Sequence, residues 1–337
     1  MSRRPRLTLF AVAVGVLALL GSGCAVLDSA RERLPGPAAS PSAAAPDGST
    51  EAPSVAPTPP PLPGRPLQAV SVLTLHFEGL RPLQAGHYEG WALIGSERVS
   101  TGKFRVTADR TLVALNGTAV SAFPLARDIA EASQISVTIE PEGDRDATPS
   151  GVVILNGALV GGRARLSFPA ALEELAGGFI LASPTDADLT NEVAGIWFTD
   201  TTATRAGLEL PELPPGWTFE GWTGTQGLSF SMGRFVRPTG PDFATPFSGP
   251  RPGYRFPGED FVARLPGTVR PPVNLADGAS TIAVTIEPDL GGQDPSGGGP
   301  FWLLPLRRAV EANTPTGVQQ RLDLDMSVVP SGVATVG

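Results

Sequence analysis

The sequence predicts an all-β fold: two tandem antiparallel β-sandwich domains, preceded by a signal peptide and a disordered linker rich in Pro, Ala and Ser. Three observations carry this prediction. Apolar and polar residues alternate in many short segments, 40 Gly and 36 Pro interrupt them, and several sequence blocks occur twice in the same order. Such short, turn-bounded segments are typical of antiparallel sandwiches.

The alternating segments are the first observation. They include residues 73–77, 135–139, 164–168, 282–286 and 322–326. A period of two places every second side chain on the same face, so each segment is predicted to be a half-buried strand. Patterns that favour helices are short, so no helical layer is expected.

The peptide VTIEP is the clearest duplication. It occurs at residues 137–141 and again at 284–288, and a Pro-Ser pair follows at 149–150 and 295–296. Val, Thr and Ile favour strands, whereas proline cannot donate to a strand ladder. Each copy is therefore predicted to be a strand, a stop and a hairpin loop.

Two further blocks recur in the same order. HYEGW at residues 87–91 aligns with TFEGW at 218–222, and Ser-x-Gly-[Lys/Arg]-Phe follows at 100–104 and 231–235. The repeat period is far longer than the roughly 20–50 residues of solenoids. The pattern indicates a duplicated domain.

The predicted organisation has four parts, and the two copies are expected to fold separately, each around its own core. The parts are a signal peptide (1–23), a lipidated Cys with a flexible Pro-rich linker (24–66), repeat 1 (67–175) and repeat 2 (176–337), the last with an aromatic insertion (238–257).

The N-terminus is typical of an exported lipoprotein. Arg3, Arg4 and Arg6 precede a mainly apolar segment, 7–20, which is too short to span a bilayer comfortably. The LGSGC that ends at Cys24 resembles a bacterial lipobox, in which the Cys becomes the lipidated first residue. An ordinary secretory signal with a free thiol at Cys24 is the alternative.

Cys24 is the only cysteine, so no disulfide within the chain is possible. Several acyl chains on one residue anchor a protein stably. The membrane is therefore the expected partner, and the expected location is extracytoplasmic, either periplasmic or at the cell surface. The net charge of −8 becomes −11 (−8 − 3) once the three arginines are removed. Nucleic acid is therefore not an expected partner.

The repeated blocks together resemble the extracytoplasmic domain of anti-sigma-K factors. That domain carries a Tyr-x-x-Trp strand, a small-residue–Gly–x–Phe segment and a Val-Thr-Val-Glu-Pro strand in the same order. The resemblance implies a β-sandwich for both repeats. It does not carry over the regulatory function, because a cleaved signal is expected here in place of the family's cytoplasmic zinc-binding anti-sigma module.

The repeated aromatic residues are predicted to fill the cores, with each Trp packed near the following Phe. They are Trp91, Phe104, Trp222 and Phe235. Glu89 and Glu220 precede the two Trp residues by two positions, which suits a structural hydrogen bond or, alternatively, carboxylate chemistry.

No catalytic residue, metal site or cofactor is expected. A glycosidase needs two differently tuned carboxylates across one cleft, whereas the two copies here present the same acids in the same frame. His76 and His87 are the only histidines, and both are expected at the surface. No Cys/His cluster or phosphate-binding glycine motif occurs.

The loops after VTIEP are acidic and suit either Ca²⁺ ligation or a solvated hairpin. Their acidic residues are Glu140, Glu142, Asp144, Asp146, Glu287, Asp289 and Asp294.

The insertion is the main asymmetry between the copies, and its aromatic and basic residues are candidates for binding. They are Phe243, Phe247, Arg251, Tyr254, Arg255 and Phe256. Long loops are usually functional or disordered. Contact with a ligand or partner, packing between domains, and disorder all stay open.

The leading functional hypothesis is a non-enzymatic, lipid-anchored extracytoplasmic protein with a binding or envelope-structural role and an envelope protein or glycan as its partner. The alternatives are an envelope-signalling module similar to the anti-sigma-K sensor domain and a surface hydrolase.

Overall fold

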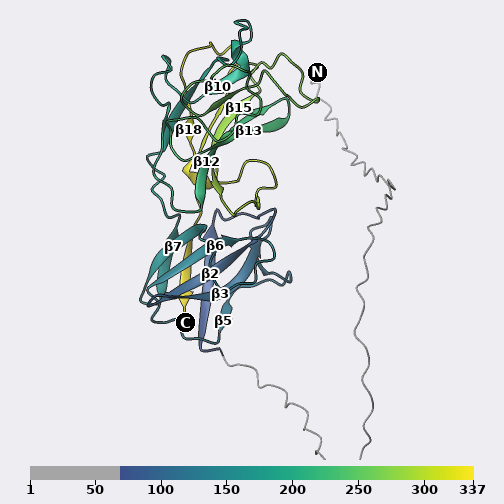
Figure 1. The fold of residues 1–337 in the computed structure, drawn as a ribbon. Helices are drawn as coiled ribbons and strands as arrows, with labels where there is room; N and C mark the ends of the chain where they lie inside the picture. The colour runs from purple at the N-terminus through teal and green to yellow at the C-terminus, as the bar shows by residue number, and fades with distance from the viewer. Residues whose placement is uncertain (1–68) are drawn as a thin grey trace, which may run out of the picture. The chain divides into compact units, whose positions relative to one another are not determined.

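The computed structural model describes residues 69–337, and the predicted signal peptide, Cys24 and linker lie outside the described residues. The all-β prediction is confirmed: this part consists of antiparallel strands and two short 3₁₀ helices, with no α-helix (Figure 1). Within it, no helix has the length and apolar character needed to cross a membrane.

The first sheet contains nine antiparallel strands in the order β4-β3-β2-β6-β7-β8-β19-β1-β5. Alternation of buried and exposed residues along β1 matches the period-two pattern of its sequence. The strands are β1 (Ser71–Glu78), β2 (His87–Ile94), β3 (Glu97–Val106), β4 (Leu112–Ala114), β5 (Phe123–Leu125), β6 (Gln134–Glu140), β7 (Val153–Val160), β8 (Arg163–Ser167) and β19 (Ser331–Val336).

The first sheet curls so that its two ends approach each other. Phe123 of β5 packs against Phe104 of β3, with ring centroids 5.7 Å apart, although the two strands lie near opposite ends of the strand order. A Cβ at Gly102 would lie 2.6 Å from the Phe123 ring, so the absence of a side chain at Gly102 permits this approach.

The C-terminal strand β19 belongs to the first sheet. It pairs with β1 (Leu73↔Val336) and with β8 (Ala164↔Ala334), and Figure 1 shows this yellow strand among the blue strands. The predicted range 176–337 for repeat 2 therefore needs correction at its end. Without β19, β1 and β8 would expose unpaired edges inside the sheet, and filling that gap favours the long return of the chain.

The second repeat forms two five-stranded sheets, one ordered β13-β12-β15-β16-β18 and one ordered β11-β9-β10-β14 with β17 also paired to β9. The elements are β9 (Ala176–Leu181), η1 (Glu192–Ala194), β10 (Gly195–Trp197), β11 (Leu208–Glu209), β12 (Trp217–Thr225), β13 (Leu228–Phe235), β14 (Gly258–Asp260), β15 (Thr281–Pro288), β16 (Leu306–Ala309), β17 (Gln320–Arg321), β18 (Asp323–Leu324) and η2 (Met326–Val328).

Both VTIEP copies occupy equivalent strands. β6 pairs with β2 with Glu89 opposite Thr138, and β15 pairs with β12 with Glu220 opposite Thr285. The pairing of each Trp-bearing strand with the next strand also shifts at the same place, beside the Gly that precedes the Trp. The duplication predicted from the sequence is thus a duplication of strand pairing.

The core is shared between the repeats, contrary to the expectation of two separate cores. Buried apolar residues of both repeats form one continuous cluster, and the described residues, 69–337, belong to one compact unit. Trp217 lies where they meet: its ring packs edge-on against Phe168 at 5.2 Å, and its Nε1 donates to the Val153 carbonyl at 3.0 Å.

The predicted pairing of Trp with Phe is also corrected. Phe104 stacks on Tyr88, and Phe235 stacks on Phe219, at centroid distances of 5.7 and 6.0 Å. Trp91 and Trp222 are buried as expected, with 1% and 6% exposure, but they point to the other face of their strands. Three positions along a strand change the face, so Tyr88 and Trp91 cannot share one.

Candidate functional site

The face of β2 and β6 that carries Trp91 is polar and buried. The indole Nε1 of Trp91 donates to Thr138 Oγ1 at 2.9 Å, and Thr138 in turn donates to Glu140. The Glu140 carboxylate also accepts from the backbone N–H of Ser150, at 3.0 and 3.1 Å from its two oxygens. Burial raises the pKa of Glu140.

The second repeat contains the same chain of hydrogen bonds. Trp222 Nε1 donates to Thr285 Oγ1 at 3.0 Å, Thr285 donates to Glu287, and Glu287 accepts from the Phe301 N–H at 2.9 Å. The Thr and Glu of VTIEP therefore satisfy the buried indole and fix the loop that follows. These bonds explain why the peptide recurs with the Trp.

The acid that precedes each Trp has internal partners as well. Glu89 accepts from Ser100, and its other oxygen lies 3.4 Å from Lys103 Nζ. In the second repeat, Glu220 accepts from Ser231, and Arg234 Nε donates to it at 2.9 Å. The sequence suggested either a structural hydrogen bond or carboxylate chemistry for these glutamates, and the structure shows the hydrogen bonds.

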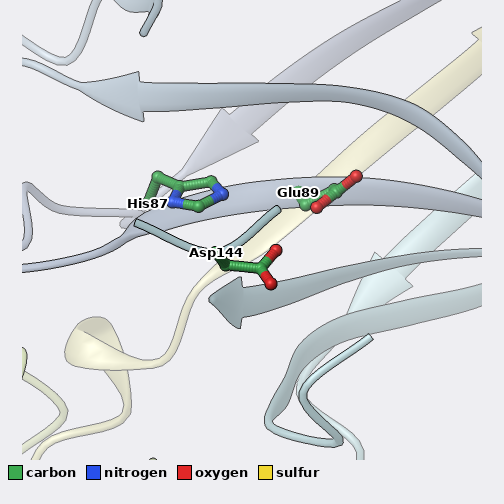
Figure 2. Close-up of side chains that lie close together, drawn as sticks. All are labelled: His87, Glu89 and Asp144. Carbon is green, nitrogen blue, oxygen red and sulfur yellow. The ribbon is translucent and has the colours of Figure 1, made fainter. Parts of the chain in front are cut away.

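In the first repeat, two further side chains lie beside Glu89. His87 lies two residues before Glu89 on β2, and Asp144 comes from the loop after β6. One ligand atom from each of the three residues lies within 4.8 Å of the other two, and Figure 2 shows the imidazole and both carboxylates close together. The sequence left Ca²⁺ ligation open for Asp144 as one of the loop acids, but it did not predict that Asp144 would meet His87 and Glu89. The three residues come from segments about 55 residues apart, and no Cys/His motif marks them.

Lys103 lies beside this cluster. Its Nζ donates to Asp144 Oδ2 at 2.7 Å and to the Asp144 carbonyl at 3.0 Å, in addition to its ion pair with Glu89. The loop that carries Asp144 is further held by Glu142, which accepts from the Gly86 N–H at 3.0 Å and pairs with Arg105.

The cluster has a distinct electrostatic character. Burial lowers the pKa of His87 and raises the pKa of Glu89, while the hydrogen bond from Lys103 lowers the pKa of Asp144. Burial opposes the charge on Lys103, but Asp144 and Glu89 outweigh it and leave the pKa of the lysine raised. The imidazole is therefore neutral at pH 7, between carboxylates that face a single ammonium.

The prediction of a surface position holds for His76 and is wrong for His87. His76 is exposed on β1, whereas His87 is 2% exposed, and no hydrogen-bond partner faces its Nε2. The sequence placed His87 after a loop glycine, but β2 begins at His87 and the acidic loop folds against it. The contact depends on tertiary structure and has no local sequence signal.

The remaining loop acids stabilise local turns. Their carboxylates accept from N–H groups two residues further along: Thr148 for Asp146, Gly291 for Asp289 and Ser296 for Asp294. These contacts match the solvated-hairpin alternative, and only Asp144 of these acids joins His87 and Glu89.

The insertion candidates do not form one surface patch. Phe256 is buried, Phe247 packs on Phe230 and Phe261, and Tyr254 packs edge-on against Trp197 at 5.4 Å. The exposed candidates are Phe243, Arg251 and Arg255. Packing against the second repeat accounts for half of the predicted binding residues.

Buried carboxylates that were not predicted from the sequence hold the insertion in place. Asp242, inside the insertion, accepts from the Gly258 N–H at 2.9 Å, and Glu259 accepts from the hydroxyl of Ser248 in the insertion. Burial raises the pKa of Asp242 to about 6 and that of Glu259 to about 7. Charged residues are rarely buried, so composition predicts exposure here.

No protein-family model, curated protein or solved structure matches this chain.

Proposed function

We propose that this protein is a lipid-anchored extracytoplasmic protein without enzymatic activity, which binds or organises a component of the cell envelope. The main support for the proposal is the structural role of the glutamates that recur in both repeats. In both repeats the buried glutamates accept hydrogen bonds from the protein itself, so they support a rigid scaffold.

The N-terminal sequence supports the location. A basic head, an apolar segment and a lone Cys24 precede a Pro-rich segment in the sequence, and the described residues follow it. Polyproline conformations extend by about 3 Å per residue, so a segment of this composition suits a tether between a lipid and a folded unit.

Envelope signalling is the second candidate. Its support is that the two VTIEP strands pair with their neighbours in the same way, because VTIEP is one of the sequence blocks that resemble the anti-sigma-K sensor domain. A hydrolase is less well supported, because a hydrolytic pair of carboxylates needs one acid and one base facing a shared substrate position.

A lipidation experiment tests the anchor. Cys24→Ser should abolish labelling by radioactive palmitate and move the protein from the detergent phase to the aqueous phase on phase partitioning. Ser22→Ala keeps a small residue in the lipobox and should behave as the wild type. Processed Cys24→Ser protein that stays with the membrane would refute lipid anchoring.

The soluble Cys24→Ser protein then tests the binding role. We expect it to sediment with isolated envelope fragments, and digestion of their protein or their glycan identifies which component holds it. Failure to sediment with either would favour the signalling candidate.

A further inference from the structure

We propose that His87, Glu89 and Asp144 form a binding site for a divalent transition-metal ion of the zinc type, and that the Lys103 ammonium holds the cation position when the metal is absent. The site lies in the first repeat and does not depend on the lipid anchor or on the proposed envelope role.

The ligand set suits zinc. One imidazole nitrogen and two carboxylate oxygens are common Zn²⁺ ligands, and a water molecule completes a tetrahedron. Ligand atoms around a tetrahedral Zn²⁺ lie roughly 3.3 Å apart, and the three groups here are within 4.8 Å of one another. The nitrogen ligand favours zinc over Ca²⁺, which prefers oxygen ligands in larger numbers.

A second observation points to a ligand. His87 is 2% exposed, and its Nε2 is buried without a hydrogen-bond partner. Glu89 Oε2 is buried as well, makes no hydrogen bond, and has only its ion pair with Lys103 at 3.4 Å. Buried polar atoms are usually paired, and each one left unpaired costs free energy. A metal ion held by His87 Nε2 would remove that cost for the histidine, and it would replace the Lys103 ammonium beside Glu89.

Lys103 explains how the site exists without metal. Its Nζ lies 2.7 Å from Asp144 and 3.4 Å from Glu89, so one positive charge already sits between the two carboxylates. The lysine side chain is 23% exposed, and its flexible stem allows the ammonium to turn toward solvent. Binding would thus exchange an ammonium for a doubly charged ion.

The second repeat provides an internal control for the site. Thr218 lies opposite Glu287 as His87 lies opposite Glu140, so Thr218 replaces His87. Arg234 replaces Lys103 and donates directly to Glu220 at 2.9 Å. Asp294, in the loop equivalent to that of Asp144, accepts bonds from Ser296 and Gly298 within its own loop. The pair of a glutamate and a cationic side chain occurs in both repeats and is therefore structural. Only repeat 1 has, in addition, an imidazole (His87) and a loop carboxylate (Asp144) beside this pair.

Titration of the detergent-solubilised full-length protein with ZnCl₂ by isothermal calorimetry tests the proposal. We expect one Zn²⁺ per chain. His87→Ala and Asp144→Asn should each weaken binding by at least about 100-fold, since loss of even an outer-sphere partner costs 10–100-fold. The controls are Thr218→Ala, at the equivalent position of repeat 2, and His76→Ala, at the other histidine; both should bind as the wild type does.

Lys103→Met provides a second readout. It removes the competing ammonium and leaves Glu89 and Asp144 without a cation between them, so the variant should melt at a lower temperature than the wild type and bind Zn²⁺ more tightly. Zn²⁺ should then raise its melting temperature more than that of the wild type. Absence of binding to the wild type, equal binding by His87→Ala, or no gain in affinity in Lys103→Met would each overturn the proposal.

Discussion

At the residue scale, the buried glutamates define the chemistry of this protein. Glu89, Glu140 and Glu287 are each about 1% exposed, and Glu220 is 7% exposed, yet every one accepts a hydrogen bond from a neighbouring side chain. Carboxylates are almost never buried unless they are paired. The repeated Trp-Thr-Glu chain provides that pairing twice.

Glu287 leads to a prediction about pH. Burial raises its pKa from 4.5 to about 7, so the folded protein holds a proton that the unfolded chain releases between these two values. Stability should therefore decrease as pH rises through this window, by up to about 3 kcal/mol for this group. Urea unfolding at pH 5 and pH 8 measures the difference.

The matched variants for this test are Glu287→Gln and Glu212→Gln. Glu287→Gln should flatten the pH dependence in part, because Glu259 and Asp242 have raised pKa values as well. Glu212 is exposed, so its variant should retain the wild-type slope. A slope unchanged in Glu287→Gln would mean that Glu287 is ionised in the fold.

At the element scale, β19 decides whether the first sheet is complete. It lies between β1 and β8, and its inward-facing Ala334 is fully buried, whereas its neighbour Thr335 is exposed. A strand placed between two others provides hydrogen bonds to both, and its loss opens two edges.

Ala334→Asp tests the importance of β19. An unpaired buried carboxylate costs about 3–5 kcal/mol, so this variant should lose most of the protection of β1 and β8 amides in hydrogen exchange. Thr335→Asp places the same charge on the exposed face and should change stability by at most about 0.5 kcal/mol. Equal effects of the two changes would contradict the pairing described.

At the scale of the whole molecule, the shared core and the return of β19 couple the two repeats. The Trp217 ring contacts Phe168, and the Glu142 N–H donates to Gln293 across the sequence boundary at 2.8 Å. A duplicated sequence alone suggests independent domains, but these contacts make each repeat part of the other's environment.

Calorimetry should therefore show one unfolding transition for the described part of the chain, with equal calorimetric and van't Hoff enthalpies. Trp217→Ala should shift that single transition downward, since removing a buried Trp costs about 3–5 kcal/mol. Phe243→Ala, at a side chain 71% exposed, should leave it unchanged. Two separate transitions would mean that the repeats unfold as independent domains, as the sequence predicted.

The sequence by itself determined the strands and the duplication. Alternating residues predicted β1, β6, β8 and β15, since the period of two is a local property of the chain. The predicted half-burial holds for β1 and β8 but is wrong for β6 and β15, which are buried on both faces. The predicted strand at 322–326 is also wrong in extent, because only Asp323–Leu324 is a strand and η2 begins at Met326. The repeated peptides predicted equivalent strands, and proline at the end of VTIEP marked where each strand stops. Burial of both repeated Trp residues followed from their size and apolar surface.

The tertiary structure alone decided which faces and segments meet. Tyr88 and Trp91 lie on opposite faces of β2 because of their spacing, but only the packing decided which face joins the core. The extra residue on β3 then places Phe104 beside Tyr88, and not beside Trp91. The meeting of His87 with Asp144 and the insertion of β19 into the first sheet join residues far apart in the chain. Such contacts depend on chain topology and on the burial of unpaired edges, and no local pattern encodes them.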